Sequence, residues 1–461
     1  MKKLWEKHWQ LDQQVEAFET GDDLLLDQKL VWADVAGSLA HAAGLKEMGI
    51  LSQKEFTQAK RGLLKILLLA KHGEFTLIMG DEDIHTKIEN YLTDHYGQVG
   101  KKIHTGRSRN DQVLTAIRLF SKQQLFDIWV AAVHLADAFL CFAKQYEYVP
   151  MPGYTHMQKA MPSSVGMWAS SLTASLLDDI VLLKAAYTLI DQSPLGSAAG
   201  YGVPIAIDRG KSAKLLGFGA VQSPSLYCQN SRGKIEAAVV AALVSLAQTV
   251  NKFASDVLLF TTSEFGFFTV ANALATGSSI MPQKKNIDAA ELLRSKVNII
   301  LGYYNSIVGI SNNLPSGYNR DLQDTKKPFM EALAMSKQIC SIAAFLVQNL
   351  KPNRENLVAA MTPEVFAAHQ VFDLVTQGIP FRDAYKMAPP KAPLQGSTLQ
   401  WITDVLHRST HLGGPGNLGL NALQKKLAAE RHCCHNATMQ FTAAMARLGV
   451  YPASRSGGIA G

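Results

Sequence analysis

Apolar residues recur at helical spacing along several long segments of this chain that contain neither glycine nor proline. Residues 110–146 are one example, with Val113, Ile117 and Phe120 on a shared face. Spacings of three and four residues define one side of an α-helix. The same pattern predicts four more long helices, over residues 167–193, 234–265, 288–301 and 329–350. Few segments alternate as strands do, so we expect an all-α protein with an elongated central helical bundle.

The distribution of helix breakers divides the chain into three zones. Residues 1–108 hold short helical patterns, residues 109–361 hold the long helices, and residues 362–461 are richer in proline and glycine. We therefore expect an N-terminal helical domain, a central long-helix bundle domain and a small C-terminal helical domain. The long helices are apolar on several faces, which are usually buried against other helices within or between subunits. A homo-oligomer is expected.

The composition is that of a globular enzyme. The 461 residues are 47% hydrophobic and 18% charged, which excludes a disordered chain. No unbroken run reaches the roughly 20 apolar residues that span a bilayer. The N-terminus carries the acidic Glu6 and no apolar core follows it, which argues against a signal peptide. We expect a cytoplasmic protein with no membrane partner.

The chain is basic, with a net charge of +7 and a pI of about 9.0. Its basic residues are scattered and form no nucleic-acid-binding motif, so we expect no nucleic-acid partner. A moderate positive bias also steers anionic small substrates towards an enzyme, which is the interpretation we prefer.

The five cysteines have no framework spacing, so reduced thiols are expected. Residues 431–435, RHCCH, contain residue types that bind metals, but their spacing does not suit a single metal site. Consecutive side chains point around most of a helix and cannot close one tetrahedral site, so no metal is expected.

Four polar segments interrupt the helical pattern. They are residues 105–112 (TGRSRNDQ), 151–158 (MPGYTHMQ), 193–202 (SPLGSAAGYG) and 277–286 (GSSIMPQKKN). The last combines two hydroxyls, two ammonium groups and two amides after a glycine. A mobile surface loop collects such residues too. Donors that converge in this way also stabilise negative charge developing on a substrate oxygen.

The other segments also allow two interpretations each. Arginines where a loop meets a helix can bind a carboxylate or phosphate, while Ser108 or Asn110 can simply cap that helix. His156 can exchange protons near neutral pH, although a lone histidine is more often structural. Glu291 can orient a histidine or favour the start of its helix.

Together with GYNRDLQDTKKP (317–328) and VAGSLAHA (35–42), these segments resemble the argininosuccinate lyase family over residues from roughly 12 to 450. That family, which the delta-crystallins of the lens also resemble, belongs to the fumarase/aspartase superfamily. The resemblance implies a homotetramer with a 20-helix core, active sites shared between subunits, and no metal or organic cofactor. TGRSRNDQV and MPQKKN are more specific to this family than GSS-MP-K-N, which the superfamily shares.

The resemblance implies a catalytic role for five residues. Ser278 would be the general base that removes the Cβ proton of the succinyl group. Lys284 and Asn286 would stabilise the resulting aci-carboxylate. His156, paired with Glu291, would assist protonation of the departing guanidinium group.

The resemblance also implies a set of substrate-binding residues: Asp83, His85, Ser108, Arg109, Asn110, Thr155, Arg232, Tyr318, Gln323 and Lys326. Three features depart from the family. Ile287 follows Asn286 where the family usually has proline, and Arg232 lacks the usual acidic neighbours. Residues 385–393 fit the family poorly.

We therefore expect reversible elimination of argininosuccinate to L-arginine and fumarate. Another fumarate-releasing lyase, such as adenylosuccinate lyase, is the alternative with the same fold; the SRNDQ and MPQKKN segments speak against it. A non-catalytic, crystallin-like structural protein is the alternative of a different class. The retention of Ser278 and the other four catalytic residues argues against it.

Overall fold

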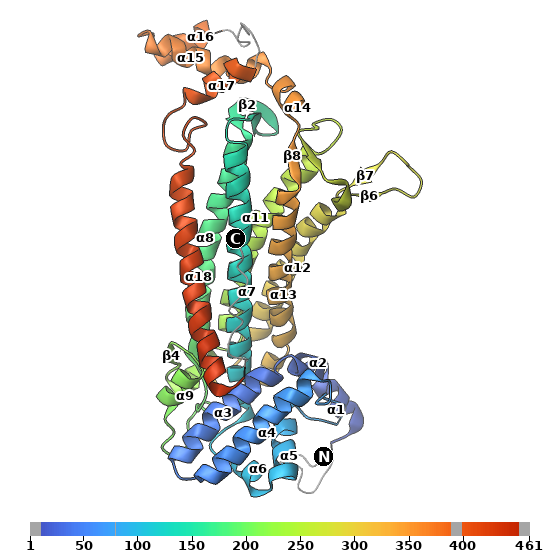
Figure 1. Ribbon diagram of the computed structural model, residues 1–461, viewed down its shortest axis with the longest axis vertical. Helices are drawn as coiled ribbons and strands as arrows, with labels where there is room; N and C mark the ends of the chain where they lie inside the picture. Colours follow the sequence, from blue (N-terminus) through green and yellow to red (C-terminus); the bar gives the residue numbers. More distant parts are fainter. Residues whose placement is uncertain (1–10, 79, 389–398, 451–461) are drawn as a thin grey trace.

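The computed structural model describes residues 11–78, 80–388 and 399–450. Residues 389–393, part of the segment that fits the family poorly, and the N-terminal stretch around Glu6 lie outside this description. Five long helices run side by side along the long axis of the molecule (Figure 1). They are α7 (Arg109–Gln145), α8 (Val165–Ile190), α11 (Lys234–Phe260), α12 (Asp288–Ser311) and α13 (Lys326–Gln348). The expected all-α, elongated bundle is confirmed.

The bundle is held together by one apolar core that extends into the N-terminal helices. Phe139, Phe253 and Phe329 are among its largest fully buried side chains. The rings of Phe139 and Phe253 meet edge to face with centroids 4.9 Å apart, an arrangement that aromatic pairs prefer. Removing such surfaces from water is the main driving force for packing the helices together.

Three helical stretches are long and apolar enough to cross a membrane by length and composition: Arg109–Gln145, Lys234–Phe260 and Arg320–Gln348. This finding corrects the expectation from the sequence, which counted only unbroken apolar runs. In the three helices 67%, 56% and 56% of the most apolar window is buried inside the protein. The apolar surface therefore serves mainly to pack the bundle.

Several helix ends differ from the prediction. The helix expected to stop at residue 301 continues through Gly302 and Gly309 to Ser311. A Cβ at either glycine would meet nothing within 4 Å, so these glycines are tolerated at an open surface. The helix expected to reach residue 265 ends at Phe260, where the chain turns back and the Phe267 N–H donates to the Phe260 carbonyl oxygen at 2.8 Å. Gly266 lies within this turn at a φ of +54°.

The end of α8 and the start of α13 also differ from the predicted bounds, each for a local reason. α8 ends at Ile190, and the next residues form a short strand instead of a last helical turn. α13 begins at Lys326, ahead of Pro328, because the first turn of a helix accepts proline.

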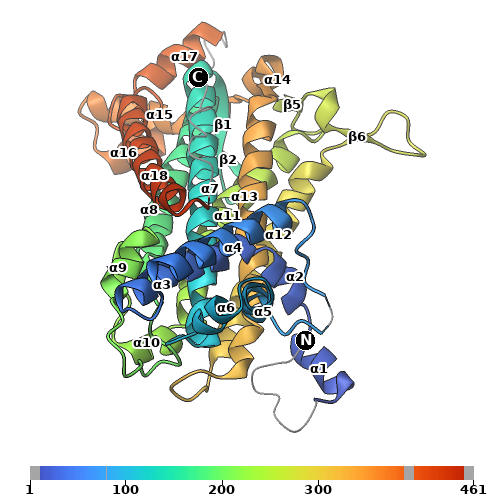
Figure 2. The same cartoon turned by 60° about the horizontal axis from the view of Figure 1, so that its bottom comes forward.

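The N-terminal helices cover one end of the bundle. They are α1 (Gln13–Thr20), α2 (Asp23–Gln28), α3 (Val31–Glu47), α4 (Gln53–Lys71), α5 (Ile84–Tyr96) and α6 (Gln98–Lys102). Figure 2, which brings the bottom of Figure 1 forward, shows α3 and α4 crossing in front of the bundle. Two short helices, α9 (Arg209–Leu215) and α10 (Ser225–Asn230), lie between α8 and α11 in the chain.

The described strands form four two-stranded pairs. Antiparallel pairs join β1 (Pro150–Thr155) to β2 (Gln158–Ser164), β5 (Phe268–Val270) to β8 (Leu350–Pro352), and β6 (Thr276–Gly277) to β7 (Lys285–Asn286). A parallel pair joins β3 (Gln192–Ser193) to β4 (Ala220–Val221). The first pair is a hairpin at the end of the bundle opposite the N-terminal helices (Figure 1).

The C-terminal part needs a correction in one respect. The helices α14 (Arg354–Ala359), α15 (Ala367–Thr376), α16 (Phe381–Met387) and α17 (Leu399–His407) follow α13. A small second core there includes Phe366 and Ile402. The last helix, α18 (Leu420–Leu448), instead runs back along α7 and α8, and its Phe441 belongs to the main core. The described residues after 361 therefore do not all form one separate small unit.

A buried lysine fixes this returning helix. The Lys122 ammonium group on α7 is fully buried, pairs with Asp191 and donates to the carbonyl oxygen of Gly217. It also lies 5.2 Å from the centre of the Phe441 ring on α18. Ion pairing and ring contacts thus tie α18 to α7 and to the chain that follows α8.

Candidate active site

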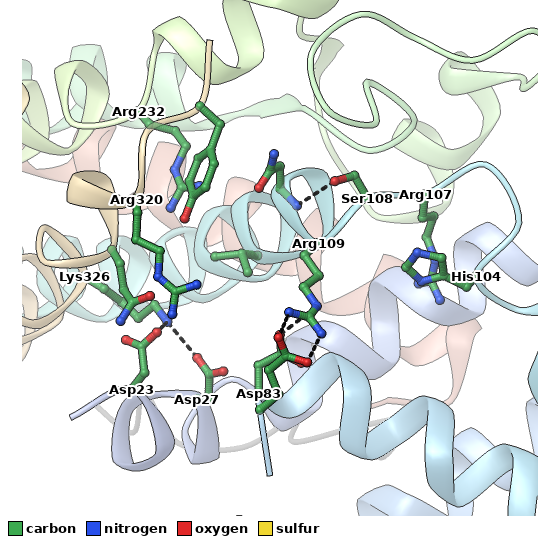
Figure 3. A pocket seen from close by; sticks show the side chains of 15 residues that line it. Asp23, Asp27, Asp83, His104, Arg107, Ser108, Arg109, Arg232, Arg320 and Lys326 are labelled. Carbon is green, nitrogen blue, oxygen red and sulfur yellow. Dashed lines mark hydrogen bonds and ion pairs between the residues drawn. The ribbon is translucent and has the colours of Figure 1, made fainter. Parts of the chain in front are cut away.

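A cavity of about 560 Å³ opens where the N-terminal helices meet the beginnings of α7 and α13 (Figure 3). Eight of the ten predicted binding residues line it: Asp83, Ser108, Arg109, Asn110, Arg232, Tyr318, Gln323 and Lys326. The sequence segments that supply them are far apart in the chain. The fold therefore assembles most of the predicted binding set in one place.

Ser108 and its neighbours are positioned by the start of α7. The Ser108 hydroxyl accepts the Asn110 N–H at 3.3 Å, and Asp111 accepts the Ser108 N–H at 3.0 Å. This reciprocal pair is a capping box, which satisfies amides that the helix leaves unpaired. Both interpretations of this segment hold together, because Ser108 caps the helix and also lines the cavity.

Asp111 also anchors the third polar segment. Its second carboxylate oxygen accepts the N–H groups of Gly196 at 2.9 Å and of Ala198 at 3.0 Å. The side chain is fully buried. Burial raises the pKa of Asp111 from 3.8 to about 6, against the opposing effect of these N–H donors. The 193–202 segment is thereby fixed to the start of α7.

The Arg109 side chain is bound within the chain. Glu82 accepts hydrogen bonds from both terminal guanidinium nitrogens, and Asp83 lies 3.2 Å from Nε. The Thr86 hydroxyl accepts a further hydrogen bond at 3.1 Å. Figure 3 shows the guanidinium group pointing towards Asp83. The edge of Arg109 that was expected to grip a substrate carboxylate is therefore occupied by Glu82.

Lys326 forms the second charged cluster of the cavity. Its ammonium group lies 2.9 Å from Asp27 and 3.0 Å from Asp23, and its side chain is only 3% exposed (Figure 3). Burial opposes the charge, but the two carboxylates outweigh it and raise the pKa of Lys326. Lys326 is thus a fixed cation beside two acids.

Arg232 and Tyr318 both line the cavity, and the guanidinium group of Arg232 stacks on the Tyr318 ring. The guanidinium carbon lies 4.8 Å from the centre of the Tyr318 ring, within the range of a cation–π contact. Arg232 is buried. On the opposite side of the cavity, burial together with Arg107 and Arg109 lowers the pKa of His104 to about 4, so His104 is neutral at pH 7 (Figure 3).

Two predicted binding residues lie elsewhere. His85 is buried and pairs with Asp34; burial opposes its charge, but Asp34 outweighs burial and raises the pKa of His85. It lies outside the residues that line the cavity. Thr155 lies in the β1–β2 hairpin, at the other end of the bundle.

Seven further residues line the cavity: Asp23, Asp27, Glu82, His104, Arg107, Val113 and Arg320. Of these, only Arg107 belongs to a segment whose arginines are predicted to bind an anion. Residues 81–83 are all acidic, and only Asp83 of the three is among the predicted binding residues. This acidic run could have pointed to Glu82 as well. For Asp23, Asp27, His104 and Arg320, no local pattern in the sequence indicates a place in the cavity.

His156 occupies the tip of the β1–β2 hairpin. Thr155 pairs with Gln158, so His156 and Met157 form a two-residue turn. Both have positive φ angles, 53° and 62°, as such a turn requires and as residues with side chains seldom adopt. Strained positions of this kind are concentrated at functional sites. The hairpin presents His156 to solvent.

The 277–286 segment projects from the side of the bundle between β6 and β7 (Figure 1). The Ser278 hydroxyl oxygen accepts the N–H groups of Ile280 at 3.3 Å and of Met281 at 3.0 Å. Lys284 is exposed, and Asn286 pairs with Thr276 at the base of the projection. In the single chain this segment is therefore a surface loop, which is one of the two interpretations.

These groups lie far apart in one chain. α7 separates the cavity from the hairpin, and its 37 residues span about 55 Å at 1.5 Å per residue. The 27 residues of α11 separate Arg232 from the projecting segment by about 40 Å in the same way. Among the described residues no hydrogen bond or ion pair joins His156 to Glu291, so their predicted pairing does not form within one chain.

In the part of the chain that the structure describes, no group of three or more histidine, cysteine, aspartate or glutamate side chains is placed to hold an ion.

Comparisons with known proteins agree with this architecture. A family model described as lyase matches residues 10–302. The argininosuccinate lyase of Thermotoga neapolitana is 43% identical over 390 residues, which cover 85% of this chain and 98% of that protein. The argininosuccinate lyase of Sorangium cellulosum is 41% identical over 431 residues, or 93% and 99% of the two chains.

Solved structures share the fold. A variant of EDDS lyase with bound fumarate superposes with a TM-score of 0.79 at 22% identity, covering 95% of each chain. A class II fumarase from Schistosoma mansoni gives a TM-score of 0.69 at 16% identity, covering 89% of this chain and 95% of the other. The predicted fumarase-like fold is confirmed.

The raised pKa of Asp111 has a consequence for stability. The folded protein keeps a proton on Asp111 up to about pH 6, whereas the unfolded chain releases it near 3.8. The stability due to this proton is present at low pH and is lost as the pH rises from about 4 to about 6. We expect the free energy of unfolding to fall less steeply over this range in Asp111→Asn than in the wild type, by urea denaturation. Equal slopes would contradict the assignment; above pH 7 the two slopes should agree.

Proposed function

The chain belongs to the argininosuccinate lyase family and is a carbon–nitrogen lyase, and we propose that it cleaves argininosuccinate to L-arginine and fumarate. The observation that carries this proposal is the cavity in which eight predicted binding residues meet. Argininosuccinate bears carboxylates, an ammonium group and a guanidinium group. A cavity lined by five lysine or arginine side chains and four carboxylates is complementary to such a mixed charge.

We propose Ser278 as the general base. A neutral hydroxyl is a poor base, so its ionised form needs stabilisation. The two backbone N–H groups that donate to Ser278 Oγ supply part of it. We assign a supporting positive charge to Lys284 of the same segment. Lys284 and Asn286 then stabilise the aci-carboxylate that forms when the Cβ proton leaves.

His156 assists protonation of the departing guanidinium group, and Glu291 orients it. Thr155, next to His156 at the hairpin tip, holds the substrate there. Arg232, Tyr318, Gln323 and the other cavity residues bind the arginine and succinate portions. The positive-φ turn that presents His156 supports this assignment, because the turn keeps the imidazole exposed for a partner outside its own chain.

We propose that the complete site forms in a homotetramer from segments of different subunits. The separation of about 55 Å along α7 supports this, since the cavity and His156 cannot meet in one chain. The bundle also exposes large apolar side chains that subunit contacts would cover, including Val181, Leu292 and Phe345. We also propose a cytoplasmic location and neither membrane nor nucleic-acid partners.

The substrate assignment is tested by following fumarate in the ultraviolet. We expect the purified protein to release fumarate from argininosuccinate and not from adenylosuccinate. Release from adenylosuccinate alone would assign the chain to the alternative lyase. Release from neither substrate would favour a crystallin-like structural role.

The general base is tested by Ser278→Ala, with Ser279→Ala as the matched control. Loss of the base should lower kcat by about 10²–10⁴-fold, the usual contribution of a positioned base. Substrate binding, measured by calorimetry, should persist, because Ser278 acts in the chemical step. Full activity in Ser278→Ala, or an equal loss in Ser279→Ala, would refute the role.

A further inference from the structure

The binding edge of Arg109 is occupied by a carboxylate of its own chain. Glu82 Oε1 accepts from Nη1 and Glu82 Oε2 accepts from Nη2. This paired arrangement is the one in which arginine binds a substrate carboxylate. The Arg109 side chain is 30% exposed and that of Glu82 is 15% exposed, so their contact lies at the cavity wall and can be reached by a ligand.

Arg109 has further contacts that would keep it oriented without Glu82. Asp83 lies 3.2 Å from Nε, and the Thr86 hydroxyl accepts from Nη2 at 3.1 Å. Asp83 is itself fixed as the N-cap of α5, where its carboxylate accepts the Thr86 N–H at 2.7 Å. Glu82 precedes the helix and stands outside any helix or strand. Orientation of Arg109 is thus supplied by the helix start, while Glu82 occupies the remaining edge.

The other cations of the cavity differ in their availability. Lys326 is bound by Asp23 and Asp27, and Arg320 lies 3.5 Å from the Glu19 carboxylate. Arg232 stacks on Tyr318 and has no ion pair with another described residue. Arg107 donates to the Ser38 hydroxyl at 2.8 Å and likewise has no ion pair with another described residue. Arg109 is therefore the cavity arginine whose two terminal nitrogens are held by one carboxylate, and a substrate carboxylate that uses this edge must displace Glu82.

We propose that Glu82 is an affinity-setting residue, an internal carboxylate that holds the Arg109 edge in the free protein and is displaced by a carboxylate of the substrate. This inference rests on the proposed function, in which the reacting half is a succinyl group and the product is a dicarboxylate. Exchange of one carboxylate for another yields little net binding energy. Glu82 therefore keeps substrate and fumarate from binding tightly, which leaves binding energy for the transition state and favours product release.

The test is Glu82→Gln, which keeps the shape of the side chain and removes its charge. We expect the KM for argininosuccinate and the inhibition constant of fumarate both to fall, by about 3- to 10-fold, as one charged competitor for a paired arginine contact is removed. Glu89→Gln is the matched control, because Glu89 lies near Arg109 and pairs with His104 at 3.4 Å without contacting Arg109. Both constants should stay within about twofold of wild type in that control.

Unchanged or higher constants in Glu82→Gln would overturn the proposal and make Glu82 an orienting partner of Arg109. An equal fall in Glu89→Gln would also overturn it, because the effect would then come from net charge alone. If Glu82→Gln loses its circular dichroism spectrum, Glu82→Asp replaces it: the shorter side chain should weaken the paired contact and lower both constants less strongly. No fall in that variant would be equally decisive against the proposal.

The proposed function and the role of Glu82 fail in distinguishable ways. A wild type that releases no fumarate from argininosuccinate refutes the function. Calorimetric binding of fumarate to wild type and Glu82→Gln still tests the exchange at Arg109, because it requires no turnover.

Discussion

The length of α7 is the constraint on which the arrangement of the site depends. Its apolar faces are buried along the whole bundle, so the helix cannot bend to bring its two ends together. The cavity lies at its first turn, and the hairpin with His156 follows its last turn. A chemistry that needs both ends must therefore use more than one copy of the chain. Because α7 is rigid, it keeps the cavity and the hairpin at a fixed separation. The same rigidity would fix their positions in an assembly of several chains.

Two of the cations that line the cavity are already paired with carboxylates of the same chain. Lys326 and Arg109 are each bound by carboxylates of the same chain, so their burial does not leave an unpaired charge. Such pairing stabilises the free protein but makes the cations costly for a ligand to use. Arg232, which stacks on Tyr318, is the more available cation. Recognition of an anionic substrate then depends on which internal pairs can exchange, and the Glu82–Arg109 pair is the one for which we propose an exchange.

The features that could be predicted from the sequence are those that a local pattern of residues determines, such as the bounds of a long buried helix. Apolar spacing located α7 to within one residue at each end, because its whole length is buried and unbroken. Gly302 caused the end of α12 to be placed too early, since an exposed glycine does not by itself stop a helix that packs on its other face. The β1–β2 hairpin was missed because prolines and a glycine mask its alternation. Tertiary packing alone brings Asp23 and Asp27 to Lys326, and no local pattern reports that.

The most direct measurement of the central claim is subunit mixing between two variants that are each inactive. Ser278→Ala lacks the base on the projecting segment, and Arg232→Ala lacks a cavity cation that has no ion pair with another described residue. If different subunits supply these two residues to each site, unfolding the variants together and refolding them should restore up to about a quarter of wild-type activity. A mixture as inactive as its separate components would contradict a site shared between subunits.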